Sequence, residues 1–538
     1  MSITFMTCRI SSRIIRLAAA ALAAFAPAVH AQAARPNLVV FITVDQFRPD
    51  YLTRFQGQLT GGLRRLLDSG AVFLRGYQDH AITETAPGHA ATMSGRFPVH
   101  TGIAFNSEGV NDVPDADVIG APNEPSASPA RFHGTTLTDW MRAQDSRMRF
   151  LSVSRKDRGA ILPIGRTKGP VFWWAGSAGT FTTSRYYADS LPGWVRQFND
   201  RHLAQRHAGE AWTLLLPDSA YTEPDSIPAE NRGRNFTFPH MVPDDSAAAA
   251  ASAAAFPWMD QMILAFALDG VNQLQLGASN GRTDLLAVSL STTDAVGHAF
   301  GPDSREMHDQ VLRLDRALGV FFDSLFKLRD QRRIIVALTA DHGMSPSPRM
   351  PSPVDANHEA SIVSLRNEFS AFRQQLTARG VDSLAVEFME GLVIVTKPDA
   401  FRRARVNVDS AVASFGADAK RVHGVLRADL FTDLAKMDTV RDDVARRWLH
   451  MFVPEGPVRM AVTLTPFSYW APGSQPTHGS PHETDARVPV IFYGAGIRPR
   501  HDSSPVRVVD MAPTLAALLQ VKPLEATDGR PLAQVVNR

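Results

Sequence analysis

Four short apolar runs constrain most strongly what this chain can fold into. They are rich in β-branched residues, and they are "NLVVFITVDQ" (37–46), "DLLAVSLSTTDAVGH" (284–298), "RRIIVALTADHGM" (332–344) and "RVPVIFYGAG" (487–496). Nearly continuous apolar runs of this length predict strands that are buried on both faces. Helical patterns lie between them, so we predict an α/β fold with a mostly parallel central sheet between helices.

Polar side chains follow these strands where ligands usually bind. Three of the runs end in an acid, and the carboxyl ends of parallel strands meet at one edge of a sheet. Asp294 and His298 are four residues apart, so on a helical turn both side chains point the same way. One further histidine lies at the end of the third run, and another precedes the fourth. The predicted cluster therefore consists of Asp45, Asp294, Asp341, His298, His342 and His478.

This cluster offers the nitrogen and oxygen donors that zinc prefers. Two zinc ions about 4 Å apart would form a clamp for phosphoryl transfer. Each residue alone has an ordinary explanation, because an acid at a strand end commonly caps a helix and an adjacent Asp–His pair is frequent. The prediction of a metal centre rests on their joint occurrence at strand ends.

Thr85 is a candidate nucleophile in the stretch "TETAPGHAATMSG" (83–95). Pro87 two residues later predicts that a helix begins here, because proline suits the first turn. A hydroxyl at a helix N-terminus lies where phosphate is favoured. Zinc coordination would lower the pKa of that hydroxyl and make it nucleophilic. Without a metal centre, Thr85 would be interpreted as a simple helix cap.

Two long segments differ in composition and hydrophobic pattern from the rest of the chain. Residues from about 107 to 280 hold Pro/Asp-rich loops and an aromatic patch, and residues from about 352 to 470 alternate short helical and strand patterns. We expect both to be insertions that cover the active-site edge of one catalytic domain, residues 36–538. The aromatic patch could stack a nucleobase or form the core of a cap. It comprises Phe172, Trp173, Trp174, Tyr186, Tyr187 and Trp194.

The first 31 residues predict a signal peptide, with a basic region before an Ala/Leu run at 17–28 and a cleavage site at Ala31. The apolar run is too short to span a bilayer. Cleavage removes three arginines and no acid, so the formal charge changes from +2 to −1 and nothing indicates a nucleic-acid partner. Cys8 is the only cysteine and leaves with this segment, which excludes a thiolate metal site. We expect an exported monomer with no membrane association after cleavage.

With these residues assembled, the sequence resembles the alkaline phosphatase superfamily. It is most similar to the single-domain, periplasmic, PafA-like and PhoK-like phosphatases that use threonine. The resemblance extends from "RPNLVVFITVDQFRPDYL" to "DMAPTLAALL" and "ATDGRPL", which is nearly the whole mature chain. It implies an alkaline phosphatase-like core, a periplasmic location and two zinc ions per chain.

The resemblance also implies how the cluster is divided. Thr85 in "TAPGH" matches the nucleophile of the family, which forms a phosphothreonine intermediate. One zinc ion would be held by Asp45, Thr85, Asp341 and His342, and the other by Asp294, His298 and His478. His89 and His482 have no such match, so we interpret them as structural or supporting residues.

Two further segments match the phosphate-binding residues of the family. "HTGIAFNSEG" implies that Asn106 donates to a phosphate oxygen, and "SRKDRGAILPIG" implies that Lys156 and Arg158 face the transferred group. A phosphate monoester carries one more charged oxygen than a diester, and a Lys/Arg pair stabilises that charge. Diesterase relatives generally lack this pair. The sequence therefore predicts an alkaline phosphatase acting on small-molecule phosphate monoesters.

Other functions are compatible with parts of the pattern. A phosphodiesterase or nucleotide pyrophosphatase would use the same two-zinc site. A non-catalytic phosphate- or metal-binding protein would keep the ligands but would not need Thr85. Sulfatase relatives usually carry a C/S-x-P-S-R motif, which is absent at this site.

Overall fold

The computed structural model describes residues 1–2, 35–109, 117–350, 360–473 and 475–537. Arg35–Arg538 forms one compact unit. The predicted signal peptide lies outside the described residues, apart from the first two positions. Cys8 and the cleavage site at Ala31 are in the part that is not described.

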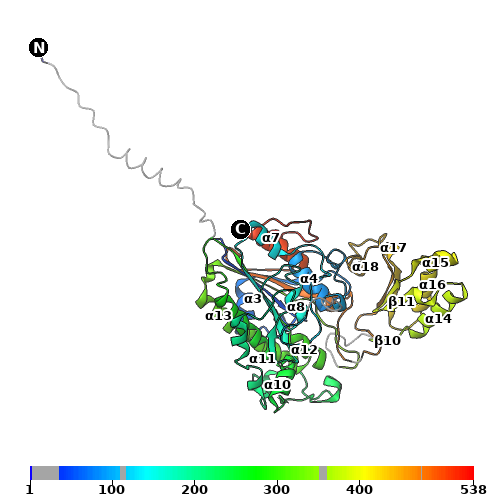
Figure 1. Cartoon of the computed structure of the whole chain (residues 1–538), viewed down its shortest axis with the longest axis horizontal. Coiled ribbons are helices and arrows are strands. Elements are labelled where there is room, and N and C mark those ends of the chain that lie inside the picture. The colour runs from blue at the N-terminus through cyan, green and yellow to red at the C-terminus, as the bar shows by residue number, and fades with distance from the viewer. Residues whose placement is uncertain (3–34, 110–116, 351–359, 474, 538) are drawn as a thin grey trace. The chain divides into compact units, whose positions relative to one another are not determined.

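A ten-stranded central sheet organises this unit (Figure 1). Its five middle strands run parallel, and β1, β8 and β9 are buried along their whole length. The path across the sheet is β17 (Arg500–Asp502), β2 (Ala71–Tyr77), β16 (Arg487–Gly494), β9 (Ile334–Thr339), β1 (Leu38–Val44), β8 (Asp284–Leu290), β3 (Phe150–Ser154), β4 (Val171–Ala175) and β5 (Thr180–Thr182), with β18 (Val506–Arg507) beside β2. The predicted α/β fold with a mostly parallel sheet is confirmed.

Two groups of helices accompany this sheet (Figure 1). The first is α3 (Gly62–Ser69), α11 (Trp258–Gln273), α12 (Thr292–Phe300) and α13 (Arg305–Leu328). The second is α4 (Thr85–Ser94), α7 (Leu137–Gln144), α8 (Asp157–Ile161) and α20 (Met511–Leu519). Of these, α3, α11 and α8 contact the strands of the sheet directly. Shorter helices are α2 (Tyr51–Arg54), α5 (Pro98–Thr101), α6 (Asn106–Gly109), α9 (Gly193–Asn199), α10 (Ser246–Ser252), α19 (Glu483–Ala486) and α21 (Ala533–Val536).

No single helix in the described ranges has the length and apolar composition needed to cross a membrane. One pair, Ser246–Ala255 with Trp258–Gln273, meets that test only when taken together, and it is bent by 91°.

The fourth apolar run forms a strand, but it is not parallel to its neighbours. β16 runs antiparallel to both β9 and β2. The start of an antiparallel strand lies at the same sheet edge as the carboxyl ends of the parallel strands. This direction brings His478, which precedes β16, to the edge where Asp45 and Asp341 lie.

The first expected insertion, about 107–280, is wrong in its bounds. Residues 150–182 supply β3, β4 and β5 to the central sheet, and α11 packs on it. The aromatic patch belongs to this core, because Phe172, Trp173 and Trp174 are 2%, 3% and 8% exposed. Phe172 packs edge-on against Phe266 with ring centroids 5.5 Å apart. The expectation that these three rings could stack a nucleobase is therefore wrong.

Residues 361–470 lie between β9 and β16 in sequence and build a subdomain with its own core. A four-stranded antiparallel sheet has the order β11 (Val386–Met389), β12 (Leu392–Val395), β14 (Val458–Leu464) and β13 (Val425–Leu430). Buried Phe372, Val393 and Phe415 belong to a cluster separate from the main core. The helices are α14 (Arg366–Ala378), α15 (Pro398–Ala404), α16 (Val408–Ala419), α17 (Phe431–Leu434) and α18 (Asp443–Leu449). The first and last strands of this range, β10 (Ile362–Val363) and β15 (Tyr469–Trp470), pair with each other. In the main unit, β6 (Ala211–Trp212) pairs with β7 (His240–Met241).

Candidate metal centre

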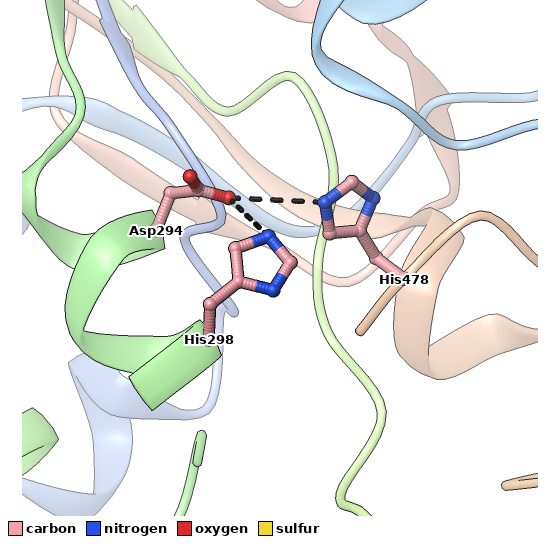
Figure 2. A group of neighbouring side chains, drawn as sticks. All are labelled: Asp294, His298 and His478. Atoms are coloured by element: carbon pink, nitrogen blue, oxygen red, sulfur yellow. Dashed lines mark ion pairs between the residues drawn. The ribbon is translucent and has the colours of Figure 1, made fainter. Parts of the chain in front are cut away.

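The edge of the central sheet gathers all six residues of the predicted cluster. Ligand atoms of Asp294, His298 and His478 lie within 4.8 Å of one another, as do those of Asp45, Asp294 and His342. Asp341 is adjacent, with Oδ2 3.7 Å from Nε2 of His342. Figure 2 shows Asp294 and His298 projecting from one helix toward His478, which comes from a separate segment. Because the two groups share Asp294, the two candidate sites adjoin.

The three histidines are oriented in the same way. In each ring Nδ1 lies 2.8 Å from a backbone carbonyl: that of Pro476 for His298, of Gly343 for His342 and of Thr83 for His478. A ring that donates from Nδ1 presents Nε2 as an unprotonated ligand. The Nε2 atoms of all three face the carboxylates at 3.3 to 3.8 Å.

Several of these ligand atoms are buried without a hydrogen-bond partner among the described residues. They are Oδ1 of Asp45, Oδ1 of Asp294, Oδ2 of Asp341 and Nε2 of His342. Buried polar atoms are nearly always satisfied, so a group of unsatisfied ones requires an explanation. Three carboxylates and three imidazoles are the donor set of a zinc-type site, and the residues therefore fit a bound metal.

The charges of the cluster favour a cation. Burial opposes ionisation of Asp294, but the ammonium of Lys156 and the imidazole of His298 hold the pKa of that carboxyl well below its usual range. Burial also favours neutral His342, yet Asp341 and Asp45 raise its pKa to about 9, so these carboxylates favour positive charge at Nε2, where a bound metal would replace the proton. For His478, burial and the neighbouring His342 and His298 lower the pKa well below its ordinary value. His478 therefore remains neutral and able to bind a metal.

Thr85 is the first residue of α4 and is 1% exposed. The helix closely approaches the cluster of candidate metal ligands because residue 88 is glycine. A Cβ there would lie 2.2 Å from the carbonyl oxygen of Asp341. Asn106 contacts the same helix start, where its Oδ1 accepts the N–H of Ala86 at 2.9 Å. Its own N–H donates to Glu84 at 2.8 Å. The predicted nucleophile and Asn106 therefore lie together beside the cluster.

Lys156 contacts both Thr85 and two carboxylates of the predicted cluster. It precedes α8, its side chain is 8% exposed, and Nζ donates to Oγ1 of Thr85 at 3.1 Å. The same ammonium lies 2.6 Å from Oδ2 of Asp45 and 2.7 Å from Oδ2 of Asp294. Arg158, in the first turn of α8, pairs with Asp157 at 3.6 Å, and its side chain is 27% exposed. The role expected for Arg158 at the phosphate therefore stays a prediction.

Sequence reasoning did not single out two residues that contact this cluster. Nη2 of Arg155 lies 3.9 Å from Oδ2 of Asp294. The backbone N–H of Gln46 donates to Oδ1 of Asp341 at 3.0 Å, with Gln46 in a left-handed conformation at φ 60°. Arg155 directly precedes Lys156 in the quoted segment, so its position was the available signal. No motif indicated Gln46, because its contact is made by the main chain.

The two histidines expected to be structural differ in their surroundings. Nδ1 of His89 lies 2.9 Å from the carbonyl oxygen of Thr85 and 3.1 Å from Oδ2 of Asp341. Its other nitrogen is 2.8 Å from the hydroxyl of Ser289. His482 is farther along the chain, where Nε2 donates to the carbonyl of Leu464 at 2.8 Å. His89 thus contacts the first turn of α4, and His482, which directly precedes α19, is hydrogen-bonded to the end of β14.

Comparison with known proteins gives matches over nearly the whole chain. A sequence model of the type I phosphodiesterase / nucleotide pyrophosphatase family matches residues 39–359. The chain is 31% identical over 536 residues to "Alkaline phosphatase PhoV" of Synechococcus elongatus, covering 94% of each protein. It is 32% identical over 535 residues to "Alkaline phosphatase PhoK" of a Sphingomonas species, covering 94% of this chain and 92% of that protein.

A solved structure extends this similarity to the fold. The crystal structure of wild-type alkaline phosphatase PafA superimposes with a TM-score of 0.85 and 27% identity, covering 93% of this chain and 99% of that chain. The resemblance to the alkaline phosphatase superfamily is thereby confirmed. The chain belongs to the type I phosphodiesterase / nucleotide pyrophosphatase family, with alkaline phosphatases as its full-length relatives.

Proposed function

We propose that this protein is a zinc-dependent alkaline phosphatase that hydrolyses phosphate monoesters through a phosphothreonine at Thr85. The observation that carries the proposal is the contact between Thr85 and Lys156, 3.1 Å apart, beside five side chains that could hold a metal and the adjacent Asp341. Phosphoryl transfer requires a nucleophilic hydroxyl, a cation and groups that can hold a metal, and all three lie at the N-terminus of α4. The full-length relatives named alkaline phosphatases support it.

We assign one zinc ion to Asp45, Thr85, Asp341 and His342, and the other to Asp294, His298 and His478. When bound, the two ions would supply Lewis-acid activation of the Thr85 hydroxyl and neutralise charge on the attacking and leaving oxygens. Four of these seven residues, Asp45, Asp294, Asp341 and His342, have buried atoms without a hydrogen-bond partner among the described residues. Each histidine is held by a carbonyl at Nδ1, which keeps Nε2 directed at the ligand cluster.

The chain's own residues then position the phosphate ester. Thr85 loses its hydroxyl proton to solvent, Oγ1 attacks phosphorus in line, a new O–P bond forms, and the bond from phosphorus to the ester oxygen breaks. The alcohol leaves and takes a proton from solvent. Lys156, Asn106 and Arg158 hold the non-bridging oxygens, and the N-terminus of α4 favours their negative charge. The oxygen of a water molecule then attacks phosphorus, the bond from phosphorus to Oγ1 breaks, and inorganic phosphate leaves. A proton from that water returns to Oγ1 and restores Thr85.

Preference for a monoester over a diester follows from charge. The transferred group of a monoester has three charged or partly charged oxygens, and Lys156 with Arg158 supplies two cations for them. The second candidate is a phosphodiesterase or nucleotide pyrophosphatase, which the matching family model favours. The burial of Phe172, Trp173 and Trp174 removes part of the support for that candidate, since these three rings cannot stack a base, whereas Tyr186, Tyr187 and Trp194 are only partly buried.

We infer that the subdomain at 361–470 forms one wall of the substrate site. Glu390, in the turn between β11 and β12, and Trp470 line the same cavity as His478. The subdomain would therefore contact the leaving group of a small phosphate ester. The predicted signal peptide supports export, and we propose a periplasmic location.

Trapping of the phosphoenzyme tests this function. Zinc-loaded protein is incubated with a radiolabelled phosphate monoester and quenched in acid, and label bound to protein is counted. We expect label in the wild type, none in Thr85→Ala, and unchanged label in Thr92→Ala, which removes another buried threonine of α4. Label that persists in Thr85→Ala would refute Thr85 as the nucleophile, and a wild type without turnover would refute the phosphatase.

A further inference from the structure

In both Asp45 and Asp294, the two carboxylate oxygens face different partners. Oδ1 of Asp45 faces Nε2 of His342 at 3.4 Å, while Oδ1 of Asp294 faces Nε2 of His298 at 3.3 Å. These are the sides on which a metal would bind. Oδ2 of both residues points instead to one group, the ammonium of Lys156, at 2.6 and 2.7 Å. Lys156 thus contacts a carboxylate from each candidate metal site.

We propose that Lys156 is a positioning residue that links the two metal sites, in addition to its contact with phosphate. This inference rests on the proposed function, because it takes Asp45 and Asp294 as ligands of different zinc ions. The ammonium fixes the rotation of both carboxylates through their outer oxygens. One side chain therefore sets the geometry of one ligand in each site.

Burial makes this contact costly to lose. The side chain of Lys156 is 8% exposed, and those of Asp45 and Asp294 are 0% and 4% exposed. Without the ammonium, two buried negative charges would face each other with the imidazoles and the guanidinium of Arg155, 3.9 Å from Oδ2 of Asp294, as the remaining neighbours. Removing one partner of a buried ion network leaves uncompensated charge, which destabilises the arrangement strongly. The carboxylates would then rotate away from the positions that suit a metal.

These contacts leave Lys156 able to bind phosphate. An ammonium has three N–H donors, and two of them form hydrogen bonds, to Oδ2 of Asp294 at 2.7 Å and to Oγ1 of Thr85 at 3.1 Å. The contact with Oδ2 of Asp45 is an ion pair without hydrogen-bond geometry, so one N–H can donate to a phosphate oxygen. The contacts with Asp45 and Asp294 then persist during turnover, so the positioning role does not compete with phosphate binding.

Zinc retention tests the inference without relying on activity. Zinc-loaded wild type and Lys156→Met are titrated with a chromophoric chelator, and the number of ions released is followed. Partners of metal-ligating carboxylates typically change affinity by about 10 to 100-fold. We expect Lys156→Met to release both ions together at about 10-fold lower chelator concentration, and Lys156→Arg to restore part of the retention because it keeps the cation.

Arg158→Met is the matched control. Arg158 is a cation two residues away whose described ion pair is with Asp157, so its loss should leave the release curve of both ions unchanged. Release of only one ion early, or tighter retention of zinc by Lys156→Met, would overturn the inference. If Lys156→Met does not fold, Lys156→Gln is titrated under the same criteria. Wild type that binds no zinc would refute the proposed function itself, and this linkage with it.

Discussion

Gly88→Ala tests how closely α4, which carries the proposed nucleophile Thr85, must approach the proposed metal ligands. A Cβ at residue 88 would lie 2.2 Å from the carbonyl oxygen of Asp341, whereas real contacts of this kind are essentially never under 3.0 Å. Helix α4 or the Asp341 segment must therefore move by about 0.8 Å, the difference between these distances. Thr85 lies one turn before Gly88 on the same fully buried helix, so it moves too.

The size of the effect follows from this shift. A displacement of about 1 Å of a reacting group costs roughly 100-fold in rate. Overpacking of a buried contact costs about 1–3 kcal/mol of unfolding free energy. We therefore expect kcat/KM for a phosphate monoester to fall by about 100-fold, while the protein remains folded with a lower Tm.

The assay is steady-state kinetics on zinc-loaded protein, with Tm measured in parallel. Gly57→Ala is the control, because a Cβ at residue 57 meets nothing within 4 Å and should change neither quantity. Wild-type kcat/KM in Gly88→Ala would refute the reasoning, since it would show that the nucleophile does not depend on this contact.

Three further predictions concern other parts of the molecule. Asn106→Ala removes the acceptor for the N–H of Ala86 and should lower both kcat/KM and the unfolding free energy, the latter by about 1 kcal/mol. The unfolding free energy is measured in urea, and an unchanged value would contradict the capping role of Asn106. Burial, Glu306 and Asp225 raise the pKa of Glu230 from 4.5 to about 9, so the folded state holds a proton that the unfolded state loses, and stability falls as pH rises between these values. Glu230→Gln should therefore raise Tm more at pH 9.5 than at pH 5, whereas exposed Glu387→Gln should not, and a pH-independent change would contradict this account. Chelation should abolish turnover, and Zn²⁺ should restore it better than Mg²⁺ because three of the donors are imidazoles; full recovery with Mg²⁺ alone would contradict a zinc-type site.

Sequence patterns were sufficient to predict the strands in the middle of the sheet and to predict that most of the candidate metal ligands lie together. β1, β8 and β9 are buried on both faces, so their composition differs sharply from that of their surroundings. The acids that follow them had to meet at one edge once the strands were parallel. Asp294 and His298 were fixed by helical spacing alone, and Pro87 marked the start of α4.

Other features depend on information that a local pattern does not contain. An apolar run has the same composition in either direction, so the antiparallel course of β16 was not evident. β3 and β4 have five residues each and lie among irregular segments, which led to their assignment to an insertion. Contacts made by the main chain, such as that of Gln46 with Asp341, follow from a turn conformation and not from side-chain identity. The bridging position of Lys156 depends on the direction of two carboxylates, which no spacing specifies.

The measurement that tests the central claim most directly is kcat/KM for a phosphate monoester and a diester that share one leaving group, on zinc-loaded protein. The account predicts a strong preference for the monoester, which collapses in Lys156→Ala and Arg158→Ala because the extra charged oxygen loses its cations. A preference for the diester that does not respond to these substitutions would contradict it, and would identify the protein as a phosphodiesterase using the same site.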